Sequence, residues 1–296
     1  MFSHVDKLRN TSIRAHRATK KKLLDAIKND YLDHVMTTKF FIDHAVADYK
    51  NCLKTNNASW TFKRPLKVDF SSGKPSLTVG NETYSITDKD KEWIAAEALN
   101  HSLSVYLIWC FEEFEIFLKN TYALVEFMDN ANWQENDFGN RTLKEIEFNK
   151  FSEYQARVRA NNKLSSDEII KRLKKLCPLI KTWEGAGVGK TKKFHWRIAY
   201  ITRIRHILVH KAGTIDDINY FEQCLRGDLG LRDNKDFDSF LLAMRQMYIV
   251  NHGERQSNIV LFDVNSRTMA NKCNTLIDIL QLYTEFVYEA VKRKCL

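Results

Sequence analysis

One guanidinium and two imidazoles stand close together at Arg205, His206 and His210. Around them, apolar residues recur at helical spacing: Ile201, Ile204, Ile207 and Leu208. At about 100° per residue, a helix that buries those apolar residues turns the three polar side chains to the opposite side, over about 140°. Arg is permanently charged and binds phosphate through two donors, and His exchanges a proton near neutral pH. Metal-free cleavage of a phosphodiester requires these two functions, a proton carrier and a fixed positive charge.

The spacing of the two histidines has other interpretations. A pair four residues apart on one helix face can hold zinc. However, no Glu lies between His206 and His210 and no third ligand stands out, so we predict no metal site. A histidine on a helix also commonly has a structural role, and this interpretation stays open.

The stretch directly upstream alternates basic and aromatic residues. Such a stretch can hold a nucleic-acid backbone and stack a base. The net charge of +9 also favours a polyanionic partner, nucleic acid first. We therefore predict an RNA-binding surface that comprises Lys190, Lys192, Lys193, His195, Trp196, Arg197 and Arg203.

The segment from Gly185 to Thr191 is similar to a phosphate-binding loop. That loop needs a Gly, four further residues and then Gly-Lys-Ser/Thr, after a strand and before a helix. Here Glu184 stands at the position of the first Gly, and the preceding residues have a helical pattern that includes Pro178. We therefore expect an inter-helix loop. A magnesium-dependent nucleoside triphosphatase that uses Lys190 remains an alternative.

Helices must position these residues, and the apolar spacing predicts them along most of the chain. The pattern changes before residue 87, where Leu77–Ile86 is predicted to form a β-hairpin with a Gly80-Asn81 turn. We predict a mainly all-α fold in two parts, an N-terminal helical region with the hairpin at 1–87 and a sheet-free helical bundle at 88–296. The predicted helices cover 12–54, 88–128, 141–160, 165–182, 191–211, 237–250 and 266–294.

Composition limits the class of protein. The 296 residues are 44% hydrophobic, enough for a buried core, and contain only 3 prolines. No apolar run approaches the ~18–20 residues that cross a bilayer, and the first residues do not have the pattern of a signal peptide. The 6 cysteines are scattered without a CxxC pair. We therefore expect a cytoplasmic protein with reduced thiols and no membrane partner.

The hexad Arg205-His-Ile-Leu-Val-His210 resembles the signature of the HEPN superfamily, in which Arg and a polar residue precede three mostly apolar residues and a His. The continuation Lys211–Asp216 and the aromatic, Glu-rich segment Trp109–Lys119 are also similar to that family. The resemblance covers roughly residues 88–296 and leaves 1–87 unmatched. It implies a HEPN-like helical bundle that dimerises and brings two Arg/His motifs together.

Many HEPN proteins are metal-independent endoribonucleases of the toxin or anti-phage type. The resemblance therefore implies this activity, no cofactor, and RNA, a second copy of the chain and an antitoxin or regulator as partners. It assigns phosphate stabilisation to Arg205, acid/base work to His210 and an orienting or assisting role to His206. The ribose 2′-OH would attack, so the products would carry 2′,3′-cyclic phosphate and DNA would not be cut.

An acidic residue on the first helix of the bundle often joins the site in this family. Glu115 is the first choice and Glu113 the second, because both flank the apolar face of their helix, whereas Glu112 points away from it. The alternative function is a non-catalytic HEPN-like module that binds RNA, a nucleotide or a partner protein. Expression separates the two, because an active toxin-like nuclease should harm its host unless Arg205 or His210 is changed.

Overall fold

The computed structural model is mainly helical, which confirms the predicted mainly all-α class. It describes residues 4–54, 61–63, 67–69, 76–78, 83–85, 88–128, 150–161, 164–186, 194–231, 234–252, 256–263 and 270–295. The helices are α1 (His4–Lys54), α2 (Asp88–Met128), α3 (Phe151–Ala160), α4 (Ser166–Leu176), α5 (Pro178–Ala186), α6 (Phe194–Lys211), α7 (Ile218–Leu229), α8 (Lys235–Tyr248) and α9 (Lys272–Cys295).

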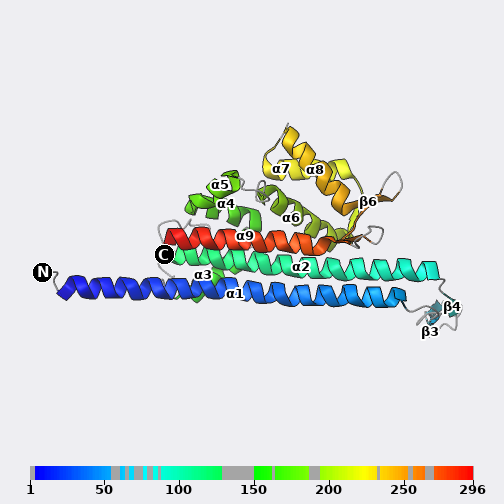
Figure 1. Cartoon of the computed structure of the whole chain (residues 1–296), viewed down its shortest axis with the longest axis horizontal. Coiled ribbons are helices and arrows are strands. Elements are labelled where there is room, and N and C mark those ends of the chain that lie inside the picture. Colours follow the sequence, from blue (N-terminus) through cyan, green and yellow to red (C-terminus); the bar gives the residue numbers. More distant parts are fainter. Residues whose placement is uncertain are drawn as a thin grey trace.

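The long helices α1, α2 and α9 lie side by side, and α4, α5 and α6 cover α9 and α2 from the side opposite α1 (Figure 1). Helices α7 and α8 lie beyond α6, and α3 packs against α2. The centre of this arrangement is the predicted apolar face of α2, whose residues are all buried: Leu107, Cys110, Phe111, Phe114, Phe117, Leu118 and Thr121. Burying this face against three other helices holds α6 in place above α2.

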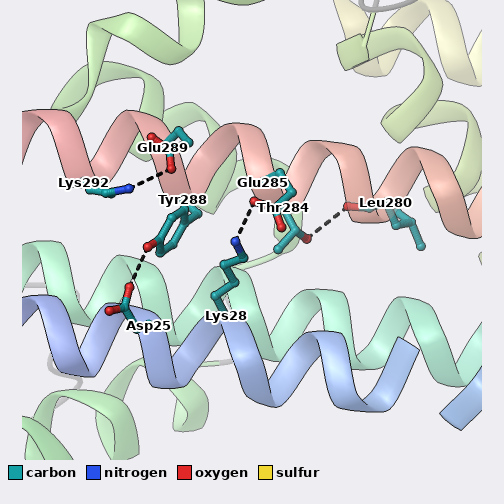
Figure 2. A network of polar contacts seen from close by, with 8 residues as sticks. All are labelled: Asp25, Lys28, Leu280, Thr284, Glu285, Tyr288, Glu289 and Lys292. Carbon is teal, nitrogen blue, oxygen red and sulfur yellow. Dashed lines mark hydrogen bonds and ion pairs between the residues drawn. The ribbon is translucent and has the colours of Figure 1, made fainter. Parts of the chain in front are cut away.

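Polar contacts join α1 to α9 along their shared length (Figure 2). The Tyr288 hydroxyl donates to Asp25 at 2.5 Å, and Lys28 forms an ion pair with Glu285 at 2.8 Å. The Lys28 ammonium also lies 4.4 Å from the centre of the Tyr288 ring. Buried residues of α1 belong to the same core as α2 and α9: Leu24, Ile27, Tyr31, Val35, Ile42 and Tyr49. The core therefore runs across the predicted boundary at residue 87.

Helix α6 buries the side that its sequence predicts, namely Ile201, Ile204, Ile207 and Leu208. The helix ends at Lys211, and the chain then reverses through Ala212 and Gly213, with φ of 47° and 85°. A Cβ at Gly213 would lie 3.4 Å from a methyl of Leu208, so glycine suits both the backbone and the packing. This reversal leaves His210 in the last helical turn, next to a short strand.

The second half of the chain is not free of sheet, contrary to the prediction. Strands β5 (Thr214–Ile215), β6 (Ile249–His252) and β7 (Gln256–Ile259) form an antiparallel sheet in the order β5-β7-β6, and β8 (Phe262–Asp263) pairs with β9 (Ala270–Asn271). Helix α7 was also not predicted. The sequence pattern does not indicate these strands, because β5 has only 2 residues and β6 only 4, and because β6 continues the apolar spacing of α8.

A β-strand insertion is present before α2, but its strands pair with other partners than predicted. Strand β3 (Ser76–Thr78) pairs with β2 (Lys67–Asp69), and β4 (Thr83–Ser85) pairs with β1 (Thr61–Lys63). The strands β3 and β4 are therefore not each other's partners, and the predicted Gly80-Asn81 turn itself lies outside the described residues. The alternation of residues identifies strands correctly, but the choice of partner depends on the register of the whole insertion.

The predicted helix at 165–182 is divided into α4 and α5 at Cys177, because Pro178 lacks the N–H that would continue the helix. Ser165 caps α4, since its hydroxyl accepts from the backbone N–H of Glu168 at 3.3 Å. The last helix begins at Lys272, later than predicted. The break at Cys177 separates α4 from α5, and both helices precede α6 in the chain.

Candidate active site on helix α6

His206 and His210 form a pair on the exposed face of α6. They lie one helical turn apart, and their ring centres are 4.6 Å from each other with a tilt of 55° between the planes. Both side chains are exposed, as the helical spacing predicts. Two imidazoles so close can share or exchange a proton with a ligand that lies across the face.

The surroundings of His206 are positive. Partial burial, followed by the charges of four neighbours, lowers the pKa of His206 from its ordinary value; these neighbours are His210, Arg203, Arg205 and Lys211. A lowered pKa keeps the imidazole neutral at neutral pH, which is the form that accepts a proton. The cations that lower it would also attract a phosphate.

Arg205 lies at the edge of α6 that faces α2. Its Nη2 is 3.4 Å from Oε1 of Glu112, and its guanidinium carbon is 6.0 Å from the centre of the Phe111 ring. The side chain is 26% exposed, and its buried Nε has no hydrogen-bond partner among the residues that the structure describes. Arg205 is thus held by one carboxylate, and a phosphate could reach only the part of the guanidinium that remains exposed.

The structure brings Glu112, and neither Glu115 nor Glu113, to Arg205. Glu115 accepts a hydrogen bond from the Ser166 hydroxyl at the start of α4, and Glu113 lies 3.7 Å from His34 on α1. Neither of the two residues that the sequence favoured for the site therefore pairs with Arg205, because the two flanks of the apolar face of α2 meet α4 and α1 at these positions. The sequence contains no signal that selects Glu112 over the other two, because all three lie within about one turn of α2.

The predicted RNA-binding residues that the structure describes differ in exposure and do not all face solvent. Trp196 is 7% exposed, with its ring 5.0 Å from Phe237, so the prediction that it stacks a base is wrong. An amphipathic helix start produces the same alternation of aromatic and polar residues as a stacking surface. The other members that can be placed are His195, Arg197 and Arg203, all half-buried, whereas Lys190, Lys192 and Lys193 lie outside the described residues.

Arg203 is an anchor at the other edge of the exposed face. Its Nη2 lies 2.6 Å from Oδ2 of Asp228 on α7. Lys211, the last residue of α6, forms an ion pair at 2.5 Å with Asp216, which lies after the helix end. These pairs fix cations on both sides of the two histidines.

The structure does not favour a phosphate loop after Glu184. Glu184 is 8% exposed, where its carboxylate pairs with Lys174 at 2.6 Å and accepts from the Tyr283 hydroxyl at 2.8 Å. Gly185 and Ala186 belong to helix α5, although the loop requires a preceding strand. The rest of the motif, from residue 187 on, lies outside the described part of the chain.

Within the described ranges, no group of three or more His, Cys, Asp or Glu is arranged to hold a metal ion. The cysteines that can be placed, Cys110, Cys177, Cys224 and Cys273, are free thiols, as expected. None of the helices, as far as they are described, combines the length and apolarity needed to cross a membrane.

No protein-family model, curated protein or solved structure matches this chain. The geometry of the α6 face and its sequence motif are therefore the observations that bear on function. That face combines two neighbouring imidazoles, a guanidinium with free donors and a carboxylate that orients it. This set can bind a phosphodiester, move a proton and stabilise a developing negative charge.

Proposed function

We propose that the protein is a metal-independent endoribonuclease whose active site is the exposed face of α6. The single observation that carries the proposal is the exposed His206–His210 pair, 4.6 Å apart, next to an Arg205 that Glu112 holds in place. The resemblance of Arg205–His210 to the HEPN signature supports the same function, with a toxin or anti-phage effector as its biological setting.

The reaction follows from what each side chain can do. The scissile phosphate lies against Arg205, whose unpaired donors stabilise the crowded phosphorane. One imidazole removes the proton of the ribose 2′-OH, and a second imidazole, of His210 or its copy in a partner, protonates the departing 5′ oxygen. The products carry a 2′,3′-cyclic phosphate and a 5′-OH. DNA lacks the attacking hydroxyl and is not cut.

A second copy of the chain is the expected partner at this face. The outer side of α2 exposes a stripe beside Arg205 that consists of Val105, Trp109, Glu112 and Ile116. Trp109 is 52% exposed, and Val209 of α6 lies exposed on the Arg205 side of α6. Contiguous apolar residues next to a functional group are typical of an interface. A two-fold contact through this stripe would bring two Arg205 side chains and two histidine pairs together.

The test is cleavage of a labelled RNA by the purified protein in excess EDTA. Wild type should cut the RNA, and Arg205→Ala should lower the rate by about 10²–10³-fold, because the transition-state charge loses its partner. Arg245→Ala, which removes a half-buried arginine of α8, is the matched control and should cut like wild type. A requirement for magnesium, or equal cleavage by Arg205→Ala, would contradict the proposal.

One observation favours the alternative of a non-catalytic RNA- or nucleotide-binding module. Arg205 already has a carboxylate partner in Glu112, and such a pair can serve as a structural contact alone. A binder would retain RNA without cutting it, and its expression would not harm a cell. Harm that disappears with Arg205→Ala supports the nuclease.

A further inference from the structure

A pocket of about 170 Å³ opens beside the first half of α6, between α4, α7 and α9. We call this cavity the base pocket. Its polar lining consists of Asp167, Lys171, Lys174, His195, Asp228 and Tyr283. Aliphatic side chains complete the walls: Ile170, Ile198 and Leu229. A cavity with apolar walls and a few convergent polar groups is typical of a site for a small planar ligand.

The base pocket and the histidine pair lie on the same face of α6. At about 100° per residue, His195, Ala199 and His206 fall within about 40° of one another. Ala199, which also lines the pocket, precedes His206 by seven residues, or about 10 Å along the helix axis. The Arg203–Asp228 ion pair, 2.6 Å long, connects the two places. A single strand bound at the histidines can therefore reach the pocket with a neighbouring nucleotide.

Two of the four charged side chains of the pocket are held in place by partners outside it. Lys174 is fixed by Glu184 at 2.6 Å, and Asp228 is fixed by Arg203. Asp167, in contrast, has no hydrogen-bond or ion-pair partner within the described ranges. Burial and the nearby Asp228 raise the pKa of its carboxyl group, although the charges of Lys171 and Arg203 act in the opposite direction. A ligand that donates hydrogen bonds to Asp167 would relieve this unfavourable position.

The arrangement of acceptors and donors selects among the four bases. Guanine offers two parallel donors, N1–H and the N2 amino group, which one carboxylate can accept together. Its O6 and N7 are acceptors that suit an ammonium group. Adenine, cytosine and uracil do not offer two adjacent donors to a carboxylate. Single-stranded RNA is read through these base edges.

We propose that the base pocket binds a guanine of the RNA next to the bond that is cut, with Asp167 on its N1–H and N2 amino group and Lys171 or Lys174 on O6 and N7. The position of the guanine next to a cleaved bond rests on the proposed nuclease function, but the binding of guanine can be tested without cleavage. A free guanine nucleotide would offer the same chemistry, so the experiment has to separate the two sources.

The binding arm uses the full chain with His210→Ala, which leaves the pocket intact and prevents cleavage. Short oligouridine RNAs that carry one guanosine, one inosine or one adenosine are titrated by fluorescence anisotropy. The guanosine RNA should bind about tenfold or more tightly than the adenosine RNA, and inosine, which lacks the N2 amino group, should lie between them. GMP alone should bind far more weakly than the guanosine RNA, because it lacks the neighbouring phosphates.

The variant Asp167→Asn keeps the size of the side chain and should remove most of the preference for guanosine. Asp43→Asn, at an exposed position of α1, is its matched control and should leave the preference unchanged. Thermal unfolding of each variant checks that the fold is retained. Equal affinity for the guanosine and adenosine RNAs would overturn the proposal. So would a preference that survives Asp167→Asn, or GMP binding as tight as that of the RNA.

A cleavage arm separates this inference from the proposed function. Wild type should cut RNA with a guanine at a fixed position relative to the cut, and Asp167→Asn should cut with that preference reduced. Cleavage without any guanine preference overturns the base pocket and leaves the nuclease standing. Absence of cleavage, together with selective binding of the guanosine RNA, overturns the nuclease and supports the pocket as a guanine site.

Discussion

Two regions of the molecule combine imidazole, guanidinium and carboxylate groups: the exposed face of α6, and a groove of about 260 Å³ between α1, α2 and α3. We call the second the α1–α3 groove. In this groove, His34 lies 3.7 Å from Glu113, and the Arg159 guanidinium donates to the Asn120 amide oxygen at 3.1 and 3.2 Å. On α6, by comparison, the two histidines face each other, and no carboxylate of the described residues lies within ion-pair distance of either.

The difference shows that the partners of a side chain decide its use more than its type does. A histidine beside a carboxylate and an arginine bound to a buried amide are occupied by the contacts that hold the helices together. On the α6 face, burial and then the neighbouring charges, among them Arg203, Arg205 and Lys211, lower the pKa of His206, which favours the neutral form that accepts a proton. Changes in the two regions should therefore affect different properties, activity on α6 and stability in the groove.

The largest expected effect is on catalysis. His210→Ala should lower RNA cleavage by about 10²–10⁴-fold, because the reaction loses a general acid or base. His34→Ala in the α1–α3 groove, an exposed histidine as well, should leave the rate unchanged. Initial rates with a labelled RNA measure both variants. A loss of activity in His34→Ala equal to that in His210→Ala would remove the distinction between the two regions.

The second prediction concerns the α1–α3 groove, where a substitution should affect stability and not cleavage. Asn120 is buried and accepts two hydrogen bonds from Arg159, so Asn120→Ala should lower the free energy of unfolding by about 1–3 kcal/mol. Its cleavage rate per folded molecule should stay that of wild type. Urea unfolding provides the measurement, with Asn29→Ala at an exposed position of α1 as the control. A catalytic defect without a change in stability would place the groove in the active site.

The third prediction concerns the titration of His206. Because burial and nearby cations lower its pKa from the ordinary 6.5, its NMR titration midpoint should lie below 6.5. The neutral base form then persists into weakly acidic solution and is lost as the pH falls through that midpoint. Arg203→Gln removes one of the cations and should move the midpoint upward, whereas Arg159→Gln should not move it. A midpoint at or above 6.5 in wild type would contradict the described surroundings.

The smallest expected effect belongs to Glu112. Its ion pair with Arg205 is partly exposed, so Glu112→Gln should change the free energy of unfolding by less than about 1 kcal/mol. Cleavage should fall by less than in Arg205→Ala, because Arg205 remains but loses its orienting partner. Glu113→Gln and Glu115→Gln are matched controls that should leave cleavage unchanged. A larger loss in Glu115→Gln would return the acidic role to the residue that the sequence favoured.

Local pattern was sufficient to predict α6 and the direction of its side chains. The spacing of Ile201, Ile204 and Ile207 defines a buried side, and this alone turns His206 and His210 outward. The partner of Arg205 could not be predicted in the same way. Glu112, Glu113 and Glu115 lie within one turn, and only the packing of α1, α4 and α6 around α2 decides which of them meets Arg205.

Other features also could not be predicted from the sequence, because they depend on tertiary packing. Trp196 has the sequence context of a stacking residue, but the position of α8 covers it. The short strand β6 follows α8 without a change in apolar pattern, so its pairing with β7 is a property of the tertiary fold. The base pocket is formed by residues from four separate helices, and their spacing in the sequence contains no sign of it.

In the proposed reaction, the α6 face cuts RNA by attack of the RNA's own 2′-hydroxyl, without a metal ion. The most direct test is a pair of matched RNA oligonucleotides in excess EDTA, one of which carries a single 2′-deoxy nucleotide on the 5′ side of a mapped cleavage bond. We predict that wild type leaves a 2′,3′-cyclic phosphate at this bond in the all-ribose RNA and does not cut it in the substituted RNA. Cleavage of the substituted bond at an undiminished rate would contradict the account.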